Sequence, residues 1–112
     1  MKLMQKLGSP MLEEEVFGEL RRLAKGNAWL LENGKIRMLK RGADGWLRST
    51  CPLCAVYVTL IGGCIATDGV FAGWGLGVPA DLTRRIIAAA DQAEGHDEVL
   101  RRRLMKACGL TA

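Results

Sequence analysis

The longest stretch of the chain without a charged residue runs from Ser49 to Thr67, and its apolar pattern predicts the centre of the fold. Over residues 52–61 apolar side chains cover every side of a helix, which is typical of a helix buried in a core or crossing a membrane. Pro52 suits the first turn of this helix, and the hydroxyl groups of Ser49 and Thr50 suit its N-terminal cap. The glycine pair Gly62-Gly63 suits its C-terminal end. The apolar segment is shorter than the ~20 residues that a bilayer requires, so the pattern favours a buried core helix. A buried strand is the alternative for much of this segment, because β-branched residues are frequent there.

Helical periodicity predicts amphipathic helices on both sides of the central helix. The first covers about residues 10–25, with Ser9 as its cap and Pro10 at its first position. After the central helix, a short helix weakened by glycines is expected over residues 71–76, and a longer helix begins at Pro79. The apolar stripe of the longer helix consists of Leu82, Ile86, Ala89, Ala90 and Ala93.

A last helix is expected after the break at Gly95-His96-Asp97. Its apolar residues are predicted to face the core, namely Leu100, Leu104, Ala107 and Cys108. Its basic residues are predicted to face solvent, namely Arg101, Arg102 and Lys106. With Arg103 these residues form a basic run, which is typical of a solvated helix face or of a nucleic-acid-binding surface.

The strongest turn signal is Asn33-Gly34, which suits a type I′ hairpin because both central residues need a positive φ. Pairing outward from this turn predicts strands over about residues 28–32 and 35–40. The register places Leu31 opposite Ile36 and Trp29 opposite Met38. A third short strand is expected over residues 46–48. The predicted fold class is mainly α with a small antiparallel β-hairpin (α+β), in one domain over residues 1–112, with the central helix surrounded by amphipathic helices.

Composition narrows the functional classes only in part. The chain has 112 residues, 49% of them hydrophobic, and a formal net charge of +4, which permits nucleic acid as a partner without requiring it. No secretory signal pattern opens the chain, so we expect a cytoplasmic protein whose cysteines stay reduced. We expect no cofactor and no membrane segment, and a homo-oligomer is possible. One histidine in the chain argues against a catalytic site that needs several.

The most specific chemical motif is Cys51-Pro52-Leu53-Cys54. Two cysteines at this spacing on a helix N-terminus lower the pKa of the first thiol, because a thiolate is favoured at the positive end of the helix dipole. The segment S-T-C-P-L-C over residues 49–54 resembles the active site of glutaredoxins. The resemblance implies that Cys51 attacks disulfides and Cys54 resolves the mixed disulfide. The sequence after Cys54 does not predict the strands of that family, so packing of both thiols in the core is the preferred interpretation.

A metal site is a further interpretation of the cysteines. Its ligands would be Cys51, Cys54 and Cys64, with Cys108 or His96 as the fourth. Structural zinc sites usually combine two close pairs of ligands, and this chain has only one such pair.

Residues 72–87 contain Leu76-Gly77-Val78 between two predicted helices, which is a helix-turn-helix pattern. A recognition helix that begins near Pro79 would bring Arg84 and Arg85 to a nucleic acid. Thr83 stands where this pattern usually has an apolar residue. Packing in the core is the preferred interpretation of Trp74. Because it lies among glycines, partial exposure is the alternative, and that alternative makes it a candidate interface residue.

The order of short segments over about residues 28–110 resembles small uncharacterised proteins encoded by phages and bacterial prophages. The segments that carry the resemblance are G-K-I-R at 34–37, C-P-L-C-A-V at 51–56, L-G-V at 76–78, R-I-I-A-A-A-D at 85–91 and L-R-R-R-L…C-G-L at 100–110. The resemblance implies a small non-enzymatic protein that binds a protein or nucleic acid, as a phage-type accessory protein or an inhibitor of a host system. The alternatives are a nucleic-acid-binding regulator that uses residues 72–87 and a thiol-disulfide redox protein.

Overall fold

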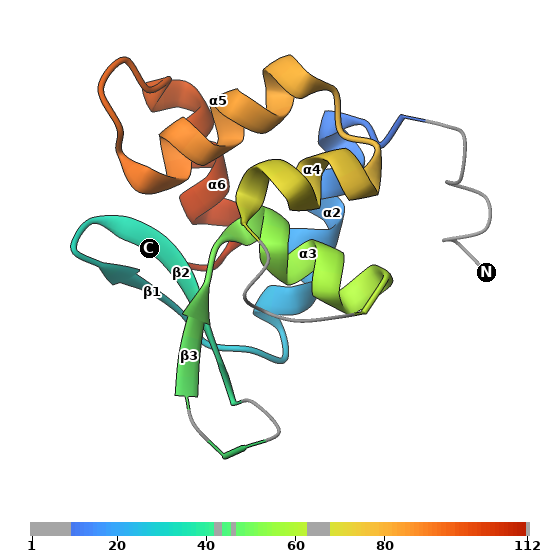
Figure 1. Cartoon of the computed structure of the whole chain (residues 1–112). Coiled ribbons are helices and arrows are strands. Elements are labelled where there is room, and N and C mark those ends of the chain that lie inside the picture. The colour runs from blue at the N-terminus through green and yellow to red at the C-terminus, as the bar shows by residue number, and fades with distance from the viewer. Residues whose placement is uncertain (1–9, 42–43, 46, 63–67, 112) are drawn as a thin grey trace.

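The structure is a computed structural model that describes residues 10–41, 44–45, 47–62 and 68–111 (Figure 1). It confirms the predicted α+β class. The described helices are α2 (Glu13–Ala24), α3 (Pro52–Leu60), α4 (Gly69–Leu76), α5 (Ala80–Asp91) and α6 (Glu98–Ala107). The strands are β1 (Trp29–Glu32), β2 (Lys35–Arg41) and β3 (Leu47–Thr50). The predictions for Ser9, Trp46 and Cys64 fall outside the described residues.

The strands form an antiparallel sheet in the order β1-β2-β3. The predicted hairpin register is confirmed, because Leu31 pairs with Ile36 and Trp29 pairs with Met38. The tip has the type I′ signature, with positive φ values at the two residues of the Asn33-Gly34 turn. The type and length of the turn fix the register of a hairpin, so the local sequence was enough to predict the pairing.

The third strand is longer than expected and changes the start of the central helix. Ser49 and Thr50 lie within β3, where Ser49 pairs with Leu39, so neither residue caps α3. The N-cap is Cys51, whose sulfur accepts the N–H of Cys54. The expected capping role of the two hydroxyls is therefore wrong, because pairing with β2 holds them in the sheet.

The central helix α3 is buried over its first half only. Residues from Pro52 to Val56 are buried among α2, α4, α5 and β2, whereas Thr59 and Ile61 are exposed. The expectation of a helix buried on all sides is wrong for the second half, because the C-terminal end of α3 lies at the edge of the molecule (Figure 1).

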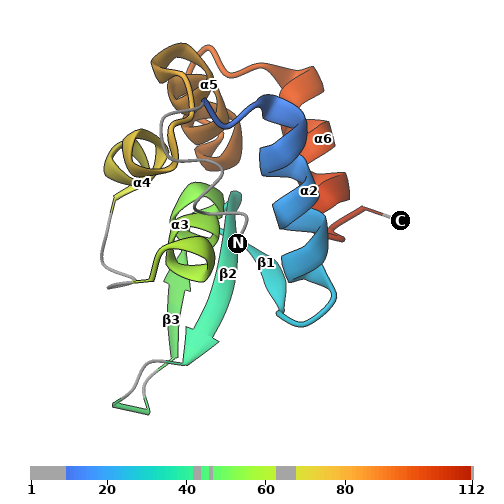
Figure 2. The ribbon, with the colours of Figure 1, turned by 90° about the vertical axis from the view of Figure 1, so that its right-hand side faces the viewer.

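Helices α2 and α6 lie side by side on the opposite side of the core from α4 (Figure 2). The α2 helix begins at Glu13 instead of Pro10. Met11 donates its N–H to the carbonyl of Gly77 at 2.8 Å, and the next residue, Leu12, is the extended N-cap of the helix. The carboxylate of Glu15 then accepts the N–H of Leu12, which satisfies one free donor at the helix start. A long-range contact of this kind cannot be predicted from local periodicity.

Candidate functional site

The first candidate surface is the pair of helices α4 and α5 with the turn Gly77-Val78-Pro79 between them. Gly77 is in the left-handed conformation with φ 76°, and Val78 donates its N–H to the carbonyl of Gly73 at 2.9 Å. These bonds satisfy carbonyls at the end of α4 and let the chain reverse directly into α5. Pro79 is the N-cap of α5. The sequence had predicted it to be the first residue of the helix, one position further along. Two helices are thus joined by the short turn Gly77-Val78-Pro79, which is the order of elements that the helix-turn-helix pattern predicts.

The two helices of this unit approach each other closely at Gly73. A Cβ atom at Gly73 would lie 2.3 Å from the Oγ1 atom of Thr83, so only glycine leaves room for that side chain. Thr83 is buried, and its hydroxyl donates to the carbonyl of Val78 at 3.4 Å. Thr83 therefore fills the contact where an apolar residue was expected. The other buried side chains of the unit are Ala72, Leu76, Val78, Leu82, Ile86, Ala89 and Ala90. Ala93, expected in the apolar stripe, is exposed beyond the end of α5.

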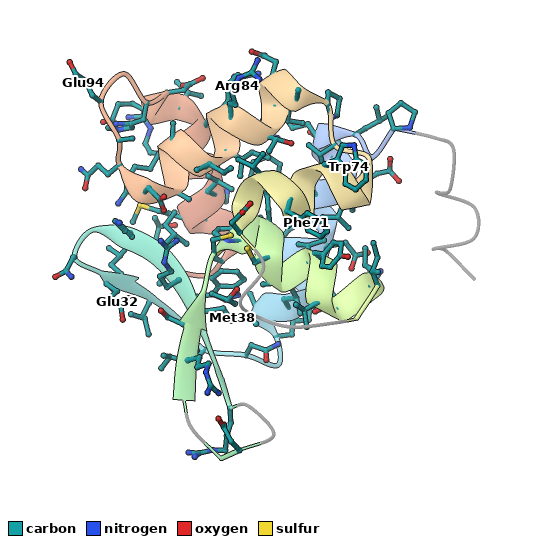
Figure 3. All side chains as sticks on the ribbon, in the orientation of Figure 1. Glu32, Met38, Phe71, Trp74, Arg84 and Glu94 are labelled. Atoms are coloured by element: carbon teal, nitrogen blue, oxygen red, sulfur yellow. The ribbon has the colours of Figure 1, made fainter. Side chains whose placement is uncertain are left out.

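Asp81, Arg84 and Arg85 are exposed on α5. Figure 3 shows Arg84 on the outer side of this helix. Arg85 forms an ion pair with Asp97 at 3.5 Å, and both side chains remain exposed. Among the described residues, the side chain of Arg84 makes neither an ion pair nor a hydrogen bond. The first two turns of α5 therefore offer two guanidinium groups, and that of Arg84 has no partner in the described part of the chain.

The other basic residues predicted to bind nucleic acid divide into two groups. Arg101 is buried, so its predicted exposure is wrong. Its guanidinium donates to the carbonyls of Ala89, Ala90 and Gly34 at 2.9, 3.3 and 2.7 Å. Arg103 pairs with Glu13 and Glu14 at 2.5 and 3.0 Å and lies 4.3 Å from the ring centre of Phe17. Arg102 and Lys106 are exposed on α6, as predicted.

Apolar side chains are exposed on α4, a helix whose sequence contains no charged residue. Val70, Phe71 and Trp74 are 62%, 48% and 76% exposed, and we call these three residues the aromatic surface (Figure 3). The ring of Phe71 lies 5.9 Å from those of Tyr57 and Trp74. The ring of Tyr57 in turn covers Gly75, where a Cβ atom would lie 2.5 Å from it. The preferred interpretation of Trp74 as a core residue is therefore wrong, and the alternative of an exposed Trp74 agrees with the structure.

The second candidate site is the pair Cys51 and Cys54 at the start of α3. Their sulfur atoms lie 2.7 Å apart, and the N–H of Cys54 points to the sulfur of Cys51 at 3.3 Å. The hydrogen bond between the two thiols lowers the pKa of Cys51; burial opposes this shift, and the backbone N–H of Cys54 and the charge of Arg37 add to it. The same hydrogen bond, together with burial, raises the pKa of Cys54. The pair is therefore polarised, with the negative charge favoured on Cys51.

Cys51 opens onto a cavity of about 460 Å³ that lies between β2, α3, α4 and α5. The polar wall includes Arg37 and Asp91, whose side chains form an ion pair at 3.0 Å, and Asp68, the N-cap of α4. The apolar wall includes Val70 and Ile87. This cavity could not be predicted from the sequence, because its walls come from segments far apart in the chain.

The residues proposed as metal ligands are only partly described. Cys108 is buried at the end of α6, and burial raises its pKa to about 12. His96 contacts the carbonyl of Ala93 and the carboxylate of Glu98, at 2.9 and 2.6 Å. Within the described ranges, no three or more side chains of His, Cys, Asp or Glu are grouped as metal ligands would be.

Comparisons of this chain with protein-family models, curated proteins and solved structures gave no match. The described helices include none with both the length and the apolar character needed to cross a membrane.

Proposed function

We propose that this protein binds double-stranded DNA through the helix-turn-helix formed by α4 and α5. The observation that carries the proposal is the combination of the tight Gly73–Thr83 contact with the outward position of Arg84 and Arg85 on α5. An α-helix fits the major groove of B-form DNA, and in this motif the second helix presents the residues near its start to the bases.

The charges on this face suit contacts with phosphates. Arginine donates two parallel hydrogen bonds to a phosphate or to guanine. The chain carries a net charge of +4, so it attracts the negatively charged DNA at long range, in addition to the direct contacts of the arginines with phosphates. The indole N–H of Trp74, which is exposed on α4, is a further hydrogen-bond donor. Two phosphate contacts alone account for about a tenfold loss of affinity between about 50 and 200 mM salt.

Fluorescence anisotropy with an end-labelled DNA duplex of mixed sequence tests the proposal. Wild-type protein is expected to bind at low salt and to lose affinity steeply as salt rises. The double variant Arg84→Ala/Arg85→Ala is expected to bind about tenfold more weakly at low salt, and to show a salt slope about 2 smaller in magnitude.

The matched control is Arg21→Ala/Arg22→Ala. These two arginines are also adjacent and exposed on a helix, and α2 is not part of the proposed surface. Both double variants lower the net charge equally, so a difference between them reports the position of the charges. Equal weakening by the two variants, or no binding of the duplex by wild type at low salt, would refute the proposal.

A second candidate function is binding of a protein through the aromatic surface. A contiguous group of exposed apolar side chains on an uncharged helix is typical of a protein interface, and tryptophan is enriched at the centre of such interfaces. The first partner to test is a second copy of this chain. Sedimentation velocity over a range of concentrations would compare Val70→Ser with Val99→Ser, because Val99 on α6 is 59% exposed and thus matched to Val70. Association that only Val70→Ser abolishes supports this function, and a monomer at every concentration excludes self-association.

A further inference from the structure

We propose that Cys51 and Cys54 form a thiol–disulfide exchange centre that reacts with small-molecule disulfides in the cavity beside α3. The site is separate from the outer face of α5 that carries the proposed DNA contacts. It therefore adds a chemical activity that is independent of the proposed binding function.

The position of the two sulfurs, in contact with each other at a helix N-terminus and beside a cavity, carries the proposal. At 2.7 Å they are closer than two sulfur atoms in ordinary van der Waals contact, and a disulfide bond needs about 2.05 Å. A small displacement therefore brings the two sulfurs to bonding distance, and a disulfide reactant must take up the two electrons for the bond to form. Both cysteines belong to the first turn of one helix, so the bond forms without a rearrangement of the fold.

The surroundings assign different roles to the two cysteines. Cys51 is half-buried at the wall of the cavity, whereas Cys54 is only 3% exposed. The sulfur of Cys51 accepts a backbone N–H at the helix N-terminus, and Arg37 adds a positive charge nearby. A thiolate is the attacking species in disulfide exchange, so Cys51 is the nucleophile. Cys54 lies behind it and attacks second.

The cavity provides access for a reactant. Its volume of about 460 Å³ is within the range of small-molecule sites. Gly69, at the start of α4, lies against the sulfur of Cys51, and a Cβ atom there would come within 3.4 Å of that sulfur and 3.0 Å of Ile87. A side chain at this position would narrow the approach to Cys51.

The reaction proceeds in two balanced steps. The Cys51 thiol gives its proton to water, and the thiolate attacks one sulfur of a disulfide R–S–S–R. The S–S bond breaks, one R–S⁻ leaves and takes up a proton, and a mixed disulfide between Cys51 and R–S forms. The Cys54 thiol then loses its proton and attacks the Cys51 sulfur, which releases the second R–S⁻. The protein dithiol is oxidised by two electrons, and the small-molecule disulfide is reduced to two thiols.

The test uses full-length reduced protein and glutathione disulfide as the probe. After an acid quench and alkylation, intact mass counts the remaining thiols and peptide mapping locates the bonds. Wild type is expected to lose two hydrogens, with Cys51 linked to Cys54 and no glutathione retained. Cys54→Ser is expected to accumulate one glutathione on Cys51. Cys51→Ser retains a good N-cap and is expected to react at least about tenfold more slowly at Cys54.

A second measurement separates an activated thiol from a merely accessible one. The rate of alkylation of Cys51 by iodoacetamide is followed against pH in folded Cys54→Ala protein and in wild type, with free glutathione as the reference. Wild type is expected to reach half its maximal rate at a lower pH than glutathione, and loss of the Cys54 thiol is expected to move that midpoint upward. A wild-type midpoint at or above that of glutathione, or oxidation that links other cysteines first, would overturn the proposal.

Discussion

At the scale of single residues, Arg101 shows how one buried side chain holds distant segments together. Its guanidinium reaches the carbonyls of Ala89 and Ala90 near the end of α5 and the carbonyl of Gly34 at the tip of the hairpin. A positive charge is favoured at a helix C-terminus, where carbonyl groups lack partners. Arg101 thus joins α6, α5 and the sheet through a single group.

Replacement of this arginine is expected to be costly. Arg101→Met keeps much of the volume and removes the donors, so buried carbonyls lose their partners and the protein loses about 2–3 kcal/mol of unfolding free energy. Chemical denaturation followed by circular dichroism measures the change. The neighbouring Arg102→Met is the control and is expected to stay within about 0.5 kcal/mol of wild type, because Arg102 is exposed. Equal effects of the two substitutions would contradict the role assigned to Arg101.

The roles of these arginines could not be predicted from the sequence. Helical periodicity predicted that Arg101, Arg102 and Lys106 all face solvent. Arg101 is instead buried because the tip of the hairpin packs against it, and this contact is not visible in the local sequence. Arg103 is engaged for a similar reason, because α2 brings Glu13 and Glu14 to it from the other end of the chain. Charge runs in sequence identify candidates, and tertiary contacts decide which of them are available.

At the scale of elements, the contact between α4 and α5 depends on the absence of a side chain at Gly73. Gly73→Ala gains about 1 kcal/mol of intrinsic helix propensity. The added methyl group would lie 2.6 Å from the Cγ2 atom of Thr83, and the resulting overpacking is expected to cost about 1–3 kcal/mol. The net result is a lower thermal midpoint, measured by calorimetry.

Two further variants test the cause of that loss. In Gly73→Ala/Thr83→Ala the second substitution removes the atoms nearest to the new methyl group, so the double variant is expected to be more stable than the sum of the single effects predicts. Gly26→Ala places its Cβ atom in open space and is expected to change stability little. Additive effects of the two substitutions would show that the helices do not meet in this way.

The start of α6 is expected to depend on pH through Asp97. Its carboxylate accepts the N–H groups of Val99 and Leu100 at 2.9 and 3.1 Å, and the bond from Leu100 is the main reason why its pKa lies below its ordinary value. A lowered pKa in the folded state contributes stability above the unfolded pKa of 3.8, and this contribution is lost as pH falls through the folded value.

Asp97→Asn isolates this contribution, because asparagine is also a good N-cap but carries no charge. Thermal midpoints of wild type and variant are expected to differ near neutral pH and to converge under acid conditions. A difference that stays constant with pH would show that the charge of Asp97 does not stabilise the helix start.

The elements themselves were largely predictable. The hairpin register followed from Asn33-Gly34, and the turn at Gly77 followed from the pattern Leu-Gly-Val. The boundaries that were wrong have tertiary causes. The bond from Met11 to Gly77 delays the start of α2, and pairing with β2 takes Ser49 and Thr50 into the sheet.

At the scale of the whole molecule, the cavity beside Cys51 and the exposed arginines of α5 lie in different places on the fold. The cavity beside Cys51 is lined by residues of β2, α3, α4 and α5, and the ion pair between Arg37 and Asp91 forms part of its wall. The sequence indicated the reactive spacing of Cys51 and Cys54, but it could not place Arg37 or Gly69 beside them. The proposed DNA contacts lie instead on the outer side of α5, where Arg84 and Arg85 are exposed.

The most direct test of the DNA-binding proposal maps the contact on the protein. Two-dimensional ¹H–¹⁵N NMR spectra of labelled protein are recorded while a DNA duplex of mixed sequence is added at low salt. The proposal predicts that the largest amide shifts fall at the start of α5, around Asp81, Arg84 and Arg85, with smaller shifts in the preceding turn. Shifts concentrated on α2 or α6, or a spectrum unchanged by DNA, would contradict the assignment of this helix-turn-helix as the binding surface.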